Sequence, residues 1–180
     1  MNDKPENGAA EEQQVPPLTV NGQYIKDLSF ESPNSPTILT ELQNAQPSVN
    51  VNVDVNAVKL EGPEGVNLFE VTLDITADLK LEEKVGFILE LKYAGVFTLN
   101  VPDEHVNAIL LIECPRMLFP YARNLISDTT RDGGFVPLFL QPIDFAGMYQ
   151  ANTLKAADEA SKEAEKAIAE IGEDDSKTVN

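Results

Sequence analysis

The chain holds one cysteine and one histidine, Cys114 and His105, the two residue types from which a nucleophilic site could be built. A cysteine acts as a nucleophile when an imidazole lies close enough to take its proton. The two residues are nine positions apart on one stretch with helical spacing, which separates them by about two and a half turns. We therefore interpret Cys114 as a buried structural residue and His105 as a solvated or capping residue.

Other motifs that carry chemistry are missing from the sequence. It contains no GxxxxGKS/T phosphate loop and no GxGxxG fingerprint, and the pair Gly133 and Gly134 is typical of a turn. It has no Cys/His cluster with zinc spacing and no DxDxDG calcium loop. Pairs of carboxylates like those of glycoside hydrolases can be found on any acidic sheet, so their presence here does not indicate that activity. We predict a protein that is not an enzyme and uses no cofactor or metal. An enzyme with an unrecognised carboxylate site is the alternative.

The net charge of −17 indicates which partners the protein attracts. Residues 19–150 carry eighteen acidic and eight basic side chains, a balance of −10, so the acidity belongs to the folded part as well as to the termini. Such a surface repels phosphate backbones, which argues against nucleic acid, and it attracts basic protein segments. The alternative explanation is that the negative charge serves only to keep the protein soluble.

The sequence also predicts a cytoplasmic protein. A single cysteine cannot form an internal disulfide, which fits a reducing compartment. The opening residues, MNDKPENGAAEEQQVPP, are polar and lack the apolar region of a secretory signal. The longest apolar run, AILLIECPRMLFPYA, contains two prolines and two charges and falls short of the ~20 residues that a membrane span needs. We expect no direct membrane insertion.

Period-2 alternation predicts four strands, at residues 23–31, 49–58, 67–79 and 85–97. Turns are expected between the last three, at EGPEG and LEEK. Along the first strand, simple alternation assigns Tyr24, Lys26, Leu28 and Phe30 to one face and Ile25, Asp27, Ser29 and Glu31 to the other.

After Pro102 the spacing becomes helical, which predicts a helix over residues 103–129. Pro115 and Pro120 should kink or restart it, because proline has no backbone donor. A second helix should follow, with Asp144 as a candidate N-cap.

Strands followed by helices imply an α+β fold, a four-stranded antiparallel sheet followed by two helices packed on one face. We place this domain at residues 19–155. Residues 1–18 are expected to form a disordered acidic tail, and residues 156–180 a solvated acidic helix end and a disordered tail.

The predicted helix at 103–129 is apolar nearly all the way round, so most of its sides must be buried. One sheet covers a single side, and the simplest further cover is another copy of the chain. We expect a homo-oligomer with these helices at its centre. The alternative is that the second helix and the proline-rich loop cover the remaining sides. A further hypothesis is a purely structural oligomer, which would show no affinity for unfolded chains.

Five segments in order and in spacing resemble the bacterial protein-export chaperone family SecB. They are YIKDLSFE (24–31), FEVTL (69–73), ELKYAGVF (90–97), ECPRMLFPYAR (113–123) and GGFVPLFLQPIDF (133–145). The resemblance implies an ATP-independent holdase that keeps precursor proteins unfolded and delivers them to the SecA motor. It implies a homotetramer, assembled as a dimer of dimers with helices between two sheets. A generic or toxin–antitoxin-linked holdase of the same fold without a SecA role is the alternative.

The resemblance also implies two sets of site residues. The basic, zinc-carrying C-terminal segment of SecA would dock on Asp27, Glu31, Ile88 and Glu90. Unfolded precursor polypeptides would bind in apolar grooves formed by Ile38, Leu39, Leu42, Val51, Val53, Met148, Tyr149 and Leu154. The chain departs from some members of the family in having no tryptophan, which favours a more aliphatic groove.

Overall fold

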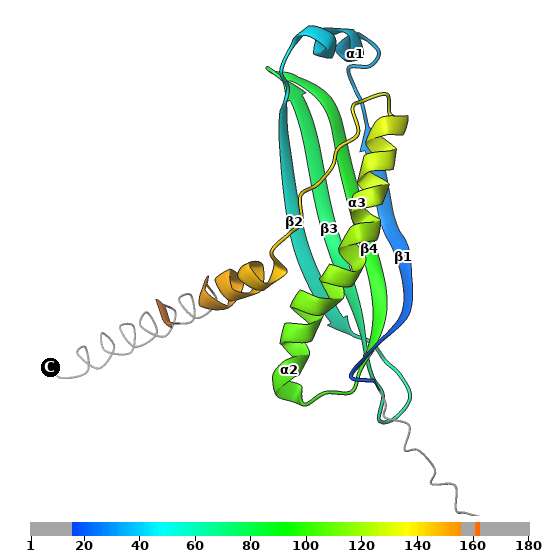
Figure 1. Cartoon of the computed structure of the whole chain (residues 1–180), viewed down its shortest axis with the longest axis vertical. Helices are drawn as coiled ribbons and strands as arrows, with labels where there is room; N and C mark the ends of the chain where they lie inside the picture. The colour runs from blue at the N-terminus through cyan, green and yellow to red at the C-terminus, as the bar shows by residue number, and fades with distance from the viewer. Residues whose placement is uncertain (1–15, 156–160, 163–180) are drawn as a thin grey trace, which may run out of the picture.

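The computed structural model describes residues 16–155 and 161–162, and these form a long sheet with a helix lying along one face (Figure 1). The two predicted tails fall almost entirely outside the described residues. Regular structure begins slightly earlier than the boundary at residue 19. The carbonyls of Pro16 and Pro17 accept hydrogen bonds from the side chain and backbone of Asn100, at 3.1 and 2.9 Å.

Four antiparallel strands make the sheet, in the order β1-β4-β3-β2. They are β1 (Leu18–Glu31), β2 (Ser48–Lys59), β3 (Asn67–Leu81) and β4 (Lys84–Leu99), as the sequence predicted. β1 and β2 are neighbours in sequence but lie at opposite edges of the sheet. The chain therefore crosses the whole sheet between them, through the short helices α1 (Thr37–Glu41) and η1 (Leu42–Asn44).

The alternation of the central strands places apolar side chains on one face. Phe69, Val71, Leu73 and Ile75 of β3 are buried together with Phe87, Leu89 and Leu91 of β4. We call this the inner face, because helix α3 packs on it, and we call the opposite side the outer face. β2 follows the same rule, since its odd-numbered residues Val49 to Val55 pair with Leu79 to Leu73 of β3.

The face assignment of β1 was wrong for part of the strand. The β1–β4 register shifts between Ile25 and Asp27, so Lys26 occupies a β-bulge. The extra residue interrupts the alternation. Tyr24 pairs with Ala94 on the outer face, which is also the face of Asp27, whereas Ile25 joins Leu28 and Phe30 on the inner face. A bulge is not visible in simple alternation, because the strand on either side of it keeps its period of two.

One continuous helical segment follows the sheet and consists of α2 (Asp103–Ala108), η2 (Ile109–Glu113) and α3 (Cys114–Asp132). η2 is a π-helical turn, in which the N–H of Cys114 donates to the carbonyl of Ile109. It ends just before Pro115, which cannot donate a backbone hydrogen bond. The predicted irregularity at Pro115 is therefore confirmed as a π turn. Pro120 lies inside α3, and the helix continues past it.

Gly95 lets α3 approach β4 closely. A Cβ atom at this position would lie 2.8 Å from Cδ2 of Leu118 and 2.8 Å from the ring of Phe97. Leu118, Ala122 and Ile126 of α3 are fully buried against the sheet as a result. Any larger residue at position 95 would have to displace the helix or a core side chain.

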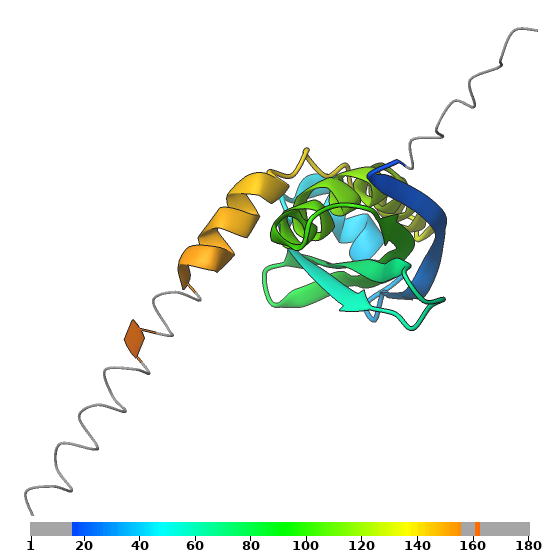
Figure 2. The same ribbon diagram turned by 90° about the horizontal axis from the view of Figure 1, so that it is seen from below.

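A second helix occupies residues 145–155 after an extended loop. Asp144 caps it, since its Oδ1 accepts a hydrogen bond of 3.0 Å from the N–H of Gly147, which confirms the predicted N-cap. Phe145 is buried, with its ring centroid 6.0 Å from that of Phe119. The helix then points away from the sheet (Figures 1 and 2), and residues 151–155 are exposed. No helix in the described ranges is long and apolar enough to cross a membrane.

Candidate binding surfaces

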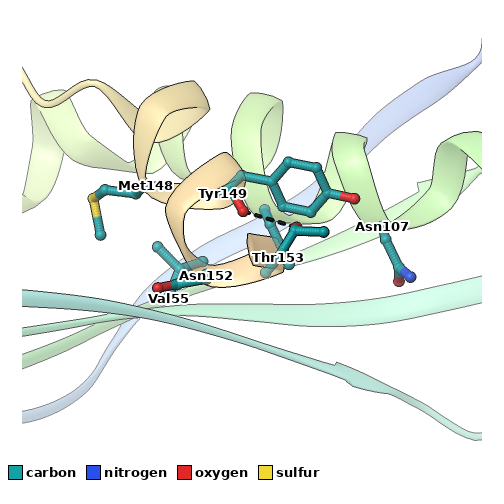
Figure 3. Close-up of a pocket in the computed structure, with 7 residues that line it drawn as sticks. Val55, Asn107, Met148, Tyr149, Asn152 and Thr153 are labelled. Carbon is teal, nitrogen blue, oxygen red and sulfur yellow. Dashed lines mark hydrogen bonds between the residues drawn. The ribbon is translucent and has the colours of Figure 1, made fainter. Parts of the chain in front are cut away.

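A cavity of about 430 Å³ lies where the second helix meets the sheet. Met148, Tyr149, Asn152 and Thr153 contribute from the helix, Val55 from β2, and Asn107 and Leu111 from α2 and η2. Figure 3 shows these side chains around the start of the helix. The hydroxyl of Thr153 donates to the carbonyl of Tyr149 at 2.9 Å, so it is satisfied within the helix. We call this the helix pocket.

A second cavity of about 490 Å³ lies at the other end of the inner face. It is lined by Leu39, Leu42, Gln43, Ala45 and Pro47 of the crossover, Leu79 of β3, and Gly134, Phe135 and Val136 of the loop after α3. We call this the crossover pocket. Two predicted groove residues, Leu39 and Leu42, line it. Ile38 is only 1% exposed and packs in the core, so the structure places it beneath the surface.

The inner face of β2 joins the two pockets. Val49 pairs with Leu79, which lines the crossover pocket, and Val55 lines the helix pocket itself. The two valines are six positions apart along the strand, a distance of about 20 Å at ~3.3 Å per residue. Val49 and Val51 are each 42% exposed, because β2 is an edge strand, and Val53 is half-buried. We call this row of valines the β2 strip.

The remaining predicted groove residues lie on the β2 strip, in the helix pocket or outside both pockets. Val51 and Val53 lie on the β2 strip, and Met148 and Tyr149 line the helix pocket. Leu154 is 68% exposed and does not line either cavity. Val55 was not among the predicted groove residues, although it lies on the same face of the strand as Val51 and Val53. Phe135 and Asn107 also line the pockets without having been predicted, because their positions depend on how the loop and helix fold back over the sheet.

The four predicted docking residues all lie on the outer face, and all are exposed. Glu31 pairs with Ile88 across the β1–β4 register, Glu90 pairs with Ser29, and Asp27 pairs with Lys92. The bulge at Lys26 is what keeps Tyr24 and Asp27 on this same face. The structure therefore brings Asp27, Glu31, Ile88 and Glu90 together at one end of the sheet.

Several acids of the outer face already have partners within the chain. The Nζ of Lys26 contacts Glu70 at 2.6 Å, and Tyr24 donates a short hydrogen bond to the same carboxylate. The hydrogen bond from Lys26, followed by that from Tyr24, holds the pKa of Glu70 below its ordinary value. The hydrogen bond to Glu70 raises the pKa of Tyr24 to about 12.

Two further acids of β3 are paired with lysines. Asp74 contacts Lys92 at 3.5 Å, and Asp78 contacts Lys80 at 3.8 Å. In contrast, the predicted docking acids Asp27, Glu31 and Glu90 make no ion pair or side-chain hydrogen bond with any residue in the part of the chain that the structure describes. These three carboxylates are thus available to a cationic partner.

The cysteine and the histidine do not form a site. Cys114 is fully buried, and burial raises the pKa of its thiol to about 12, which leaves it protonated and unreactive. His105 is exposed, with its Nε2 3.4 Å from Glu104. Within residues 16–155 and 161–162, no three His, Cys, Asp or Glu side chains are grouped so that they could hold a metal ion.

Apolar pockets along one face and unpaired carboxylates on the other define a protein whose surfaces are suited to binding. The family model described as "Preprotein translocase subunit SecB" matches residues 11–156. The protein-export protein SecB of Rhodospirillum rubrum is 52% identical over 147 residues, which cover 82% of this chain and 89% of that one. SecB of Paramagnetospirillum magneticum is 53% identical over 137 residues, 76% of this chain and 86% of that one. The chain belongs to the SecB family of protein-export chaperones.

A solved structure shows the same fold at much lower sequence identity. It is the SecB-like chaperone of Mycobacterium tuberculosis, determined in complex with a ChAD peptide from the HigA1 antitoxin. The TM-score is 0.53 and the identity 14%, with 71% of this chain and 91% of that one covered. The relatives named for protein export are far more similar in sequence, so a toxin–antitoxin-linked role is not favoured.

Proposed function

We propose that this chain is an ATP-independent holdase that keeps precursor proteins unfolded in the cytoplasm and delivers them to SecA without catalysing a reaction. The observation that carries the proposal is the separation of two surfaces by one sheet. The inner face has two apolar pockets joined by the β2 strip, and the outer face has the three predicted docking acids, none of which is in an ion pair with a described residue. A client and a cationic partner can therefore be held at the same time.

Client binding would follow from the spacing of the pockets. A span of about 20 Å needs roughly six residues of extended chain. An unfolded polypeptide with apolar side chains at its ends could thus place one in each pocket and lie against Val51 between them. Weak contacts along one chain reinforce each other through effective concentration. A folded protein buries the same side chains and would not bind.

SecA docking would use the outer face. The exposed Ile88 lies opposite Glu31 and next to Glu90 on the same face, and Asp27 lies further along the sheet opposite Lys92, so the surface combines an apolar contact with three carboxylates. A basic segment such as the C-terminal segment of SecA has the complementary charge. Charged contacts of this kind mainly set the rate of association and are weakened by salt.

A homotetramer is part of the proposal. Apolar side chains of α3 and β1 remain exposed on the single chain, among them Met117, Tyr121, Ile25 and Val20. Ile25 and Tyr121 also line a common cavity of about 540 Å³. An apolar surface of this kind between two elements is typical of an interface between copies of a chain.

Light scattering of the purified chain tests the proposal. The chain alone should form a four-chain particle, and it should bind an unfolded precursor but not the folded form of the same protein, with or without ATP. A monomer, or a particle that is indifferent to the unfolded chain, would contradict the holdase proposal.

A further inference from the structure

Lys92 lies between two carboxylates on the outer face. Its register partner on β1 is Asp27, and its register partner on β3 is Asp74. The lysine pairs with Asp74, with Nζ 3.5 Å from the carboxylate oxygen. Asp27 has no ion pair within residues 16–155. One lysine is thus flanked by two acids, and it neutralises only one of them.

The arrangement of charges across the sheet explains this choice. Asp54 of β2 lies directly opposite Asp74, and its carboxylate accepts a hydrogen bond of 2.8 Å from Asn52 without an ion pair. Two like charges facing each other across a strand pair are unfavourable, and a neighbouring cation relieves them. Lys92 therefore has two carboxylates on the β3 side, Asp74 next to it and Asp54 one strand beyond, and a single carboxylate, Asp27, on the β1 side.

A single substitution can shift the pairing of Lys92 from Asp74 to Asp27. The side chain of Lys92 is 47% exposed and has a flexible four-carbon stem. An exposed ion pair of this kind is weak, so loss of one partner leaves the lysine free to turn to the other.

We propose that Lys92 determines how strongly the outer face binds a cationic partner, because its pairing with Asp74 leaves the carboxylate of Asp27 free. Asp74 is then a positioning residue that acts through Lys92. This inference deepens the proposed docking of SecA and rests on it. It predicts that removing an acid at position 74 weakens docking by releasing a competing lysine and not merely by removing a charge.

Calorimetric titration of the full chain with the zinc-loaded C-terminal segment of SecA, at one fixed ionic strength, tests the inference. Lys92→Gln should tighten binding by roughly two- to fivefold, because it removes a repulsive cation beside Asp27. Asp74→Asn should weaken binding by a similar factor. The matched control is Asp74→Asn in the Lys92→Gln background, which removes the same charge but has no lysine to release. There the change should be less than about twofold.

The outcomes separate the inference from the proposed function. If Asp74→Asn weakens binding equally in both backgrounds, or if Lys92→Gln changes nothing, the inference is wrong while the docking proposal stands. If the unmodified chain does not bind the segment at all, the docking proposal fails, and the inference fails with it. Thermal unfolding of each variant identifies any loss of binding that comes from misfolding.

Discussion

The hydroxyl of Thr130 accepts a hydrogen bond of 3.0 Å from the backbone N–H of Leu138. Thr130 is fully buried near the end of α3, and the same hydroxyl donates to the carbonyl of Ile126 at 2.9 Å. Its own carbonyl accepts the N–H of Phe135 at 3.1 Å. One residue thus fixes two points of the loop that lines the crossover pocket and leads on to the helix pocket.

Thr130→Val keeps the shape of the side chain but removes the acceptor for the N–H of Leu138. We expect a loss of about 1–3 kcal/mol in the free energy of unfolding, since a part-buried donor loses its partner. The amide of Leu138 should also lose its protection in native-state hydrogen exchange. Thr130→Ser retains the hydroxyl and should keep that protection. Unchanged protection in the valine variant would show that the hydroxyl does not hold the loop.

The β2 strip predicts a difference between two valines of one strand. Val51 lies on the inner face opposite Ala77, whereas Val58 lies on the outer face opposite Glu70. Val51→Asn should weaken the binding of an unfolded precursor by about 1 kcal/mol, or roughly fivefold in Kd, because an apolar contact is lost.

Val58→Asn is the matched control, since it makes the same change on the opposite face of the same strand. Fluorescence anisotropy of a labelled unfolded precursor measures both variants. Equal weakening by the two substitutions would place client binding somewhere other than the strip.

Reversal of two docking acids should separate the two surfaces. Asp27→Lys combined with Glu31→Lys should weaken SecA binding by tenfold or more, roughly the effect of two repulsive contacts, and should leave precursor binding unchanged. Glu61→Lys combined with Glu64→Lys changes the net charge equally, in the turn between β2 and β3 at the other end of the sheet. This control should leave docking largely intact. Loss of both activities in the first variant would contradict the model of separate surfaces.

The pairing of Glu70 with Lys26 and Tyr24 predicts part of the response to acid. The pKa of Glu70 is lower in the folded chain than its ordinary value of 4.5. The carboxylate therefore contributes stability that is present above that value and is lost as the pH falls through its folded-state pKa. Glu70→Gln should flatten the decline in stability below about pH 4.5 in urea unfolding at a series of pH values. Lys26→Met, which removes the main cause of the shift, should flatten it in part. An unchanged acid slope in Glu70→Gln would contradict the assignment.

The features that depend on local order could be predicted from the sequence. Alternation located all four strands, because each side chain of a strand points to the face opposite its neighbour's. The N-cap at Asp144 and the irregularity before Pro115 follow from the chemistry of single residues, a short acceptor side chain and a missing donor. The order and spacing of five segments were enough to indicate the SecB family.

Other features were decided only when distant segments met. The bulge at Lys26 reverses the face of Tyr24, and it depends on the register between β1 and β4. Ile38 belongs to the core because the crossover folds onto the sheet, whereas Leu39 beside it lines a pocket. The sequence determined by itself that the surface is acidic. Only the tertiary structure decided that Lys92 pairs with Asp74 and leaves Asp27 free, because ion pairs form between side chains that the sheet brings together from different strands.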